Sequence, residues 1–382
     1  MPVTDEDLAI DRELSELSGL LPLLRYATPV NVIEARAAFF DGAEDPPFEY
    51  RPLPDLSEVS RRLAAVDVDC ANDPVVAHMA RDKKRELEIR LDLLGSRGTD
   101  DFFLASVEMF GHVEKPMLDL AKELLESTEP AESTETISAE DFATAARTEI
   151  EFYRTSYPEL DSAVYVDEST TGVVVENGDV YVGADTRLAL DRVEQLIHHE
   201  VGVHVLTYAN GSMQPLRMLE VGLAGYDENQ EALGVLAEHL AGGLAVPRLR
   251  VLAYRVVAAH LRSGQATFAE TVQHLADIGA GTRTAFTITM RAFRAGGMTK
   301  DAIYLRGLVR LCEHLAKGGE LDRLFVGKIT LEDEPLVAEL MEREVLIEPV
   351  LTPRFLETNT ARGRLEEIRS GKDVRDIGGV TT

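Results

Sequence analysis

The chain of 382 residues has no tryptophan and only two cysteines, Cys70 and Cys312. Two cysteines are too few for a disulfide scaffold, so we expect both to be buried free thiols in a cytoplasmic protein. The sequence also lacks any uncharged apolar run of about 18 residues, the length that a membrane helix needs. Its acidic N-terminus, MPVTDEDLAIDREL, lacks the apolar core of a signal peptide. These absences argue against disulfide-rich secreted proteins and membrane-spanning proteins.

Basic residues are scarce as well: 39 Lys and Arg stand against 67 Asp and Glu, a formal net charge of −28. A surface of this charge repels polyanions, so we exclude nucleic acid and anionic membranes as general partners. The acidic excess is spread along the chain and is not held in one tail, which fits either a salt-tolerant host or a need for solubility.

What the sequence does contain is helical periodicity through most of its length, interrupted once. The segment SAVYVDESTTGVVVENGDVYVGAD alternates, is rich in valine and carries the hairpin dipeptide Asn177-Gly178. We predict two or three short strands there, around 163–166, 172–176 and 179–183. A helix capped by Asp185 and ended by Asn210-Gly211 is expected to follow.

The whole pattern predicts an α+β fold that is predominantly α-helical. We expect a helical N-terminal region over 1–135, a zincin-like catalytic domain over 136–365 and a loose C-terminal tail over 366–382. In the catalytic domain, a small β-sheet directly precedes the helix that carries a cluster of histidines.

That helix holds three of the nine histidines within seven positions, in the order His198, His199, Glu200 and, after Val-Gly-Val, His204. Imidazoles flanking a glutamate, with a carboxylate further on, are the ligand set of a catalytic zinc ion. His199 and His204 are five residues apart, about 500° of rotation on an α-helix, so they share a face only if the helix is distorted, for example by a π-bulge near Gly202. Glu200 and His204 are four apart and form a competing ligand pair without distortion.

A downstream glutamate completes either set. Glu231 lies in the first turn of the next predicted helix, after a loop long enough to fold back, and is the natural third ligand. Asp227 is either the N-cap of that helix or a partner that holds a ligand histidine, and we favour the cap. Glu238 and His239 are expected to be solvated or to support a ligand.

These motifs resemble a known family. HEVGVH, followed by GYDENQEALGVLAEHL, is similar to the QEGLA-motif proteins, named in bacteria for modulating flavohaemoglobin expression. The same domain is found in the animal microtubule-associated tyrosine carboxypeptidases, which remove the C-terminal tyrosine of α-tubulin. The similarity extends from about residue 20 to about residue 360 and includes KDAIYLRGLVR. Here the motif reads Gln-Glu-Ala-Leu-Gly at 230–234, and Val203 stands where we expect threonine.

The resemblance implies zinc held by His199, His204 and Glu231, with Glu200 as the general base, and it thereby favours the distorted helix. Tubulin activity is not carried over, because the acidic tail of tubulin would be repelled by so acidic a protein.

Two further roles need side chains. A second electrophile for the oxyanion could be Tyr304, Arg306 or Tyr226. A carboxypeptidase also needs a cation for the terminal carboxylate of its substrate. The candidates for it are Arg283, Arg291 and Arg294, expected on one side of a single helix, and then Arg306 and Lys328.

We therefore predict a zinc-dependent, carboxypeptidase-like metallopeptidase that acts on a peptide or protein C-terminus. The alternatives are a zinc amidohydrolase for a small amide or amino-acid conjugate, and a non-catalytic regulatory protein with a structural metal site. A free strand edge at 172–176 could bind a peptide by edge pairing, which would favour the first of these.

Overall fold

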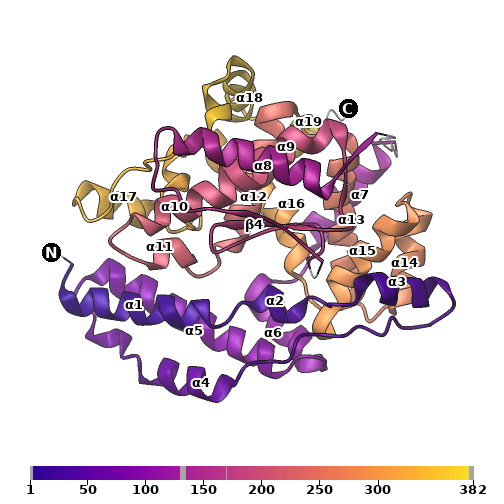
Figure 1. Ribbon diagram of the computed structural model, residues 1–382, viewed down its shortest axis with the longest axis horizontal. Helices are drawn as coiled ribbons and strands as arrows, with labels where there is room; N and C mark the ends of the chain where they lie inside the picture. Colours follow the sequence, from indigo (N-terminus) through magenta and orange to yellow (C-terminus); the bar gives the residue numbers. More distant parts are fainter. Residues whose placement is uncertain (1–2, 130–134, 169, 378–382) are drawn as a thin grey trace.

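The computed structural model describes residues 3–129, 135–168 and 170–377. Helices make up most of the molecule, and the few short strands lie near its centre (Figure 1). The predicted fold class, α+β and predominantly α-helical, is confirmed. None of the helices in these ranges combines the length and the apolar character needed to cross a bilayer.

The N-terminal region is helical, and several of its helices begin at capping side chains. Thr4 and Asp7 form a reciprocal capping box at the first helix. Asp11 of the same helix accepts hydrogen bonds from the backbone N–H groups of Arg217 and Met218, which ties it to a segment 200 residues away. The helices are α1 Asp5–Gly19, α2 Leu23–Ala27, α3 Val32–Phe40, α4 Leu56–Ala65, α5 Pro74–Gly95, α6 Asp100–Phe110 and α7 Lys115–Glu126.

The predicted strands are confirmed to within one residue: β2 Val164–Asp167, β3 Val173–Glu176 and β4 Asp179–Gly183. They form one sheet in the order β2-β4-β3, with β2 parallel and β3 antiparallel to β4. Helix α8 (Ala139–Arg154) packs against β2 and β4. β3 is therefore an edge strand of this sheet.

The expected cap at Asp185 is wrong. Arg187–Ala189 form strand β5, which pairs antiparallel with β1 (Thr136–Ser138). A short 3-10 turn, η2 (Leu190–Arg192), follows, and the helix begins only at Val193. Pairing with β1, about 50 residues earlier in the chain, makes 187–189 a strand. The local sequence pattern does not predict this pairing.

Among the described residues, two clusters of buried apolar side chains form the core. The larger runs from Ile10 to Ile377 and joins the N-terminal helices to α12 (Asp227–Gly242), α13 (Val246–Ser263) and α16 (Ile303–Ala316). The smaller joins α8, the sheet and one face of the histidine helix. The N-terminal helices share the larger core with helices that follow residue 135. The division into two domains at residue 135 stays a prediction.

Further helices lie in the C-terminal half: α11 Met218–Val221, α14 Phe268–Asp277, α15 Thr282–Phe293, α17 Glu334–Glu342, α18 Asn359–Arg369 and α19 Val374–Ile377. The structure differs from the loose tail expected over 366–382, because α19 buries Val374 and Ile377. Residues 378–382 lie outside the described residues. Cys312 is buried as predicted, whereas Cys70 is exposed at the end of the surface turn η1 (Val68–Cys70), so that prediction is wrong.

Candidate metal centre

The histidine helix has a widened turn in its middle. α9 (Val193–His199) passes into a π-helical segment, η3 (Glu200–Val205), and continues as α10 (Leu206–Ser212). The longer turn of a π-helix brings residues five apart onto the same side. The local distortion predicted from the spacing of His199 and His204 is confirmed.

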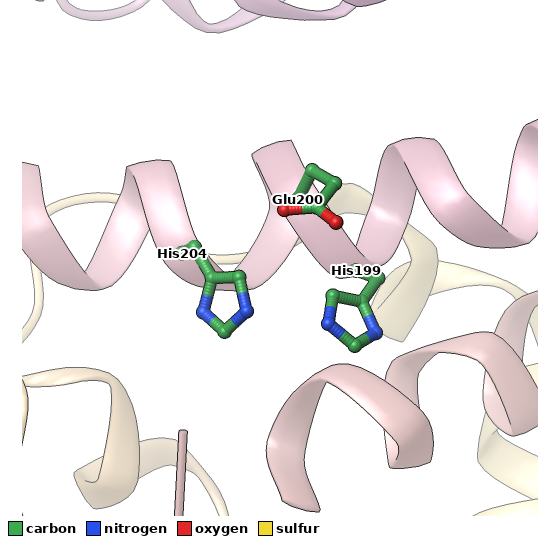
Figure 2. Close-up of side chains that lie close together, drawn as sticks. All are labelled: His199, Glu200 and His204. Carbon is green, nitrogen blue, oxygen red and sulfur yellow. The ribbon is translucent and has the colours of Figure 1, made fainter. Parts of the chain in front are cut away.

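The two imidazoles lie side by side, with ring centroids 4.9 Å apart and planes at 78° (Figure 2). Glu231, in the second turn of α12, faces them, and its Oε2 is 3.9 Å from Nε2 of His199 and 3.9 Å from Nε2 of His204. The ligand atoms of a tetrahedral zinc ion, at about 2.0–2.2 Å from the metal, lie roughly 3.4 Å apart. Each of the two carboxylate–imidazole distances therefore exceeds this separation by about half an ångström.

A second carboxylate competes with Glu231. Ligand atoms of His199, Glu200 and His204 all lie within 4.8 Å of one another, so two triads share the same histidines. Burial opposes ionisation of Glu231, but the charge of Lys300, followed by those of the histidines, holds the pKa of Glu231 at about 2. Burial raises the pKa of Glu200 to about 7. A metal ligand must be ionised and a general base must exchange a proton near neutrality, so these pKa values favour Glu231 as ligand and Glu200 as base.

Glu238 holds the outer nitrogen of His199. Nδ1 of His199 lies 2.8 Å from Glu238 Oε1, and both side chains are buried. Arg248 binds both carboxylate oxygens of Glu238 at 2.9–3.2 Å, and Arg192 binds Oε2 at 3.0 Å. With the proton on Nδ1, the free Nε2 of His199 faces Glu231. Of the two roles considered for Glu238, supporting a ligand is the one that the structure shows.

Gln230 lies at Nδ1 of His204, as Glu238 lies at Nδ1 of His199, and the sequence did not suggest this role. Its Oε1 lies 3.4 Å from Nδ1 of His204 and accepts a hydrogen bond of 2.8 Å from the Thr207 hydroxyl. Burial, followed by the charge of His199, lowers the pKa of His204 to about 4. His204 is therefore neutral at physiological pH, as a metal ligand must be.

Lys300 pairs with the second carboxylate oxygen of Glu231, and the sequence did not suggest this role either. Its ammonium lies 3.2 Å from Glu231 Oε1 and 2.9 Å from Asp227 Oδ1, and its side chain is 3% exposed. Tyr304 also lies near enough to help lower the pKa of Glu231. The favoured reading of Asp227 as an N-cap is wrong, since it lies within α12 and pairs with Lys300.

Residues 37–373 match the family described as "Microtubule-associated tyrosine carboxypeptidase". The chain belongs to this family. The matched range contains the histidine helix, Glu231 and Lys300, and it confirms the resemblance drawn from the motifs. The family is one of carboxypeptidases, which supports peptidase activity in general terms.

No curated protein matches the chain significantly. Among solved structures, the chain is similar to one described as a lipoprotein from Colwellia psychrerythraea. The two share 12% identity at a TM-score of 0.41, over 88% of this chain and 69% of the other.

Of the side chains proposed for the remaining carboxypeptidase roles, Tyr304 influences the pKa of Glu231 and the charge of Lys328 influences that of His204. The ammonium of Lys328 lies 5.0 Å and 5.8 Å from the ring centroids of Tyr208 and Tyr226, and burial lowers its pKa to about 8. Tyr226 is half-buried beside Lys328, so we assign Tyr226 a packing role.

Arg306 and Arg283 are engaged elsewhere. Arg306 donates to Glu228 and to the carbonyl oxygen of Phe110, on the wall of a cavity of about 300 Å³. Arg283 is exposed and pairs with Asp185 at 3.1 Å. Among the described contacts neither reaches the histidines or Glu231, so the structure does not bring these two predicted residues to the site.

Arg291 and Arg294 converge on Asp301, which lies next to Lys300 in the chain. The expected row of three arginines on one helix face is wrong, because α15 ends at Phe293 and Arg294 begins a new turn. Arg255 of α13, absent from the sequence-based candidates, takes the place of Arg283 beside them.

Proposed function

We propose that the protein is a zinc-dependent metallocarboxypeptidase that acts on a peptide or protein C-terminus. The observation that carries the proposal is the convergence of Nε2 of His199, Nε2 of His204 and Oε2 of Glu231, at 3.9 Å from the carboxylate oxygen to each nitrogen. Two imidazoles and one carboxylate form the donor set of a catalytic zinc site that keeps one position open. Membership in a family named for carboxypeptidase activity supports the same class.

In this mechanism the protein side chains hold and move protons. A bound zinc ion would supply Lewis acidity and lower the pKa of a water molecule at its open position towards about 7. Glu200, with a pKa of about 7, accepts the proton of the attacking water and later returns it to the leaving amine. The hydroxyl of Tyr304, near Glu231, is the candidate to stabilise negative charge on the substrate carbonyl oxygen.

The sheet beside the site supports a peptide over a small amide. β3 is an edge strand and packs against η3. Val173 and Val175 contact the core that contains Val201 of η3, and Val174 between them is 41% exposed. A peptide can pair with such an edge and be aligned along the histidine helix, whereas a small amide would gain nothing from it.

The test combines metal analysis with peptide cleavage. The purified wild type, Glu200→Gln and His204→Ala are loaded with zinc, dialysed, and incubated with a peptide library that has free C-termini. Wild type and Glu200→Gln should each retain one zinc ion, and His204→Ala should lose it. Cleavage should fall at least about 100-fold in Glu200→Gln. His260→Gln, at an exposed position of α13, is the matched histidine control and should keep both zinc and activity.

Three results would count against the proposal. If the wild type binds no zinc, the proposed metal site is wrong. If Glu200→Gln cleaves as fast as the wild type, Glu200 is not the general base. Hydrolysis of N-acyl amino acids without any cleavage of peptides would favour the small-amide alternative.

A further inference from the structure

The segment 346–357, here called the strap, lies between α17 and α18 and is bound to the end of the histidine helix by two amide side chains. Asn210 accepts a hydrogen bond of 2.9 Å from the Leu351 N–H and donates one of 2.8 Å to the Leu351 carbonyl oxygen. Gln214, four residues further on, makes the same two bonds with Ile347, each of 3.0 Å. The two amides pair with backbone groups as a neighbouring β-strand would, so the strap has a fixed register on this helix.

The far end of the strap is the 3-10 turn η7 (Arg354–Glu357), which is bound to α8. The Arg354 N–H donates a hydrogen bond of 2.9 Å to the hydroxyl of Tyr153. The guanidinium of Arg354 pairs with both carboxylate oxygens of the buried Glu149, with Nε 2.9 Å from Oε1. These bonds hold Phe355, the next residue, beside the histidine helix.

Phe355 packs against the middle of the π-helical segment. A Cβ atom on Gly202 would lie 3.4 Å and 3.6 Å from two carbons of the Phe355 ring, so the ring contacts the helix at its glycine. The centroid of the same ring is 5.2 Å from that of His198, and Phe355 is 3% exposed. η7 also packs against α12, which carries Glu231. The strap therefore contacts both helices that carry the proposed metal ligands.

The π-helical turn needs support from its surroundings. Such turns are rare, and sparsely populated backbone conformations persist where neighbouring structure imposes them. In a regular α-helix His199 and His204 would point about 140° apart around the axis and could not share an ion. The contacts of the strap lie at the π-helical turn itself, through Phe355, and at the end of the helix that follows it, through Asn210 and Gln214.

We infer that the strap holds the histidine helix in its π-helical form, and that Phe355 is a positioning residue for His199 and His204. The inference rests on the proposed metal centre and adds to it the element that sets the separation of the two imidazoles. Phe355 acts through the backbone at Gly202 and contributes no ligand atom.

The first experiment compares two phenylalanines of equal burial. Phe268 of α14 is also 3% exposed, but its ring contacts other phenylalanines and none on the histidine helix, namely Phe39, Phe48, Phe286 and Phe293. Metal-free wild type, Phe355→Leu and Phe268→Leu are titrated with cobalt(II), and zinc affinity is measured by competition with a chelator.

Phe355→Leu should lower the affinity for both metals about 10- to 100-fold, the range typical when a ligand loses its support. It should also alter the visible spectrum of bound cobalt, which reports the ligand geometry. Phe268→Leu should bind both metals like the wild type. Both variants should unfold at lower denaturant concentration than the wild type, so a loss of stability alone does not explain a difference between them.

The second experiment uses only the wild type. By thermodynamic linkage, a strap that favours the metal-binding form is itself stabilised by the metal. Hydrogen exchange is compared in the metal-free and the zinc-loaded protein. Zinc should slow exchange roughly 10-fold at the N–H groups of Ile347, Leu351 and Arg354, and should leave exchange in α14 unchanged.

Equal metal affinity in Phe355→Leu and the wild type, or exchange in the strap that zinc does not slow, would overturn the inference and leave the metal centre standing. A wild type that binds neither zinc nor cobalt would overturn the metal centre and the inference together.

Discussion

A Cβ atom on Gly234 would lie 2.4 Å from Cε1 of His199 and 2.6 Å from both ring nitrogens. Glycine in the middle of a helix costs about 1 kcal/mol relative to alanine, so its place within α12 calls for a reason. The space that it leaves is filled by the imidazole that faces Glu231. Gly234, the last residue of the Gln-Glu-Ala-Leu-Gly motif, thus leaves the space that the His199 ring occupies.

Gly234→Ala should displace the His199 ring and lower zinc affinity about 10- to 100-fold, the range typical when a ligand loses its support. Competition with a chelator of known affinity measures the change. The control is Gly363→Ala on α18, where an added Cβ meets nothing within 4 Å and zinc affinity should not change. Unaltered zinc binding in Gly234→Ala would mean that His199 is not a ligand in this position.

Glu238→Gln should destabilise the metal-free protein by about 3–5 kcal/mol, because it leaves Arg248 and Arg192 buried without their counter-charge. Chemical denaturation gives the free energy of unfolding. Glu313→Gln, which breaks an exposed pair with Lys317 on α16, should change it by less than about 1 kcal/mol. Similar values for the two variants would show that the Glu238 network contributes little to folding.

Lys300→Met should make folding more dependent on metal. Without the ammonium, the carboxylates of Asp227 and Glu231 lose the one cation that pairs with both among the described residues, and the metal-free protein should lose about 3–5 kcal/mol of stability. Zinc would then supply the missing positive charge, so the rise in melting temperature on adding zinc at pH 8 should exceed that of wild type. An equal or smaller rise would contradict a direct contact between Lys300 and a metal ligand, and Lys300→Arg should behave like wild type.

We expect His239 to lower the free energy of unfolding in mild acid. It is buried, neither ring nitrogen has a hydrogen-bond partner among the described residues, and burial lowers its pKa from 6.5 to about 4. Between pH 6.5 and pH 4, His239 is therefore protonated in the unfolded chain and neutral in the folded protein. The free energy of unfolding that is present above pH 6.5 decreases as the pH falls towards 4. At pH 5 the loss is about 2 kcal/mol.

His239→Leu removes this titration, so its unfolding free energy relative to wild type should rise by about 2 kcal/mol between pH 7.5 and pH 5. Denaturation curves at the two pH values give the difference. Parallel pH dependence in the two proteins would show that His239 is not the group responsible.

The sequence predicted those parts of the site that lie close together in the chain. The five-residue spacing of His199 and His204 required a distorted helix, and the π-helical segment from Glu200 to Val205 is that distortion. The strands were predicted from valine alternation and a hairpin dipeptide. Helix geometry alone left His199 and Glu200 as rival partners of His204, with Glu231 completing either set. The separate roles proposed for Glu200 and Glu231 rest on burial and on neighbours from other helices.

What could not be predicted depends on residues far apart in the chain. Lys300 meets Glu231 across 69 positions, and Glu238 meets His199 across 39. β5 forms only because β1 lies beside it. Arg306 was a reasonable candidate by type, but Glu228 on a neighbouring helix already engages its guanidinium. Local patterns carry no information on such pairings.

Crystals of the zinc-loaded protein, measured on both sides of the zinc absorption edge, test the metal centre most directly. The predicted result is one anomalous peak about 2.0–2.2 Å from Nε2 of His199, Nε2 of His204 and Oε2 of Glu231, with Glu200 outside the coordination sphere. A peak coordinated by Glu200 in place of Glu231, or no peak at this position, would contradict it.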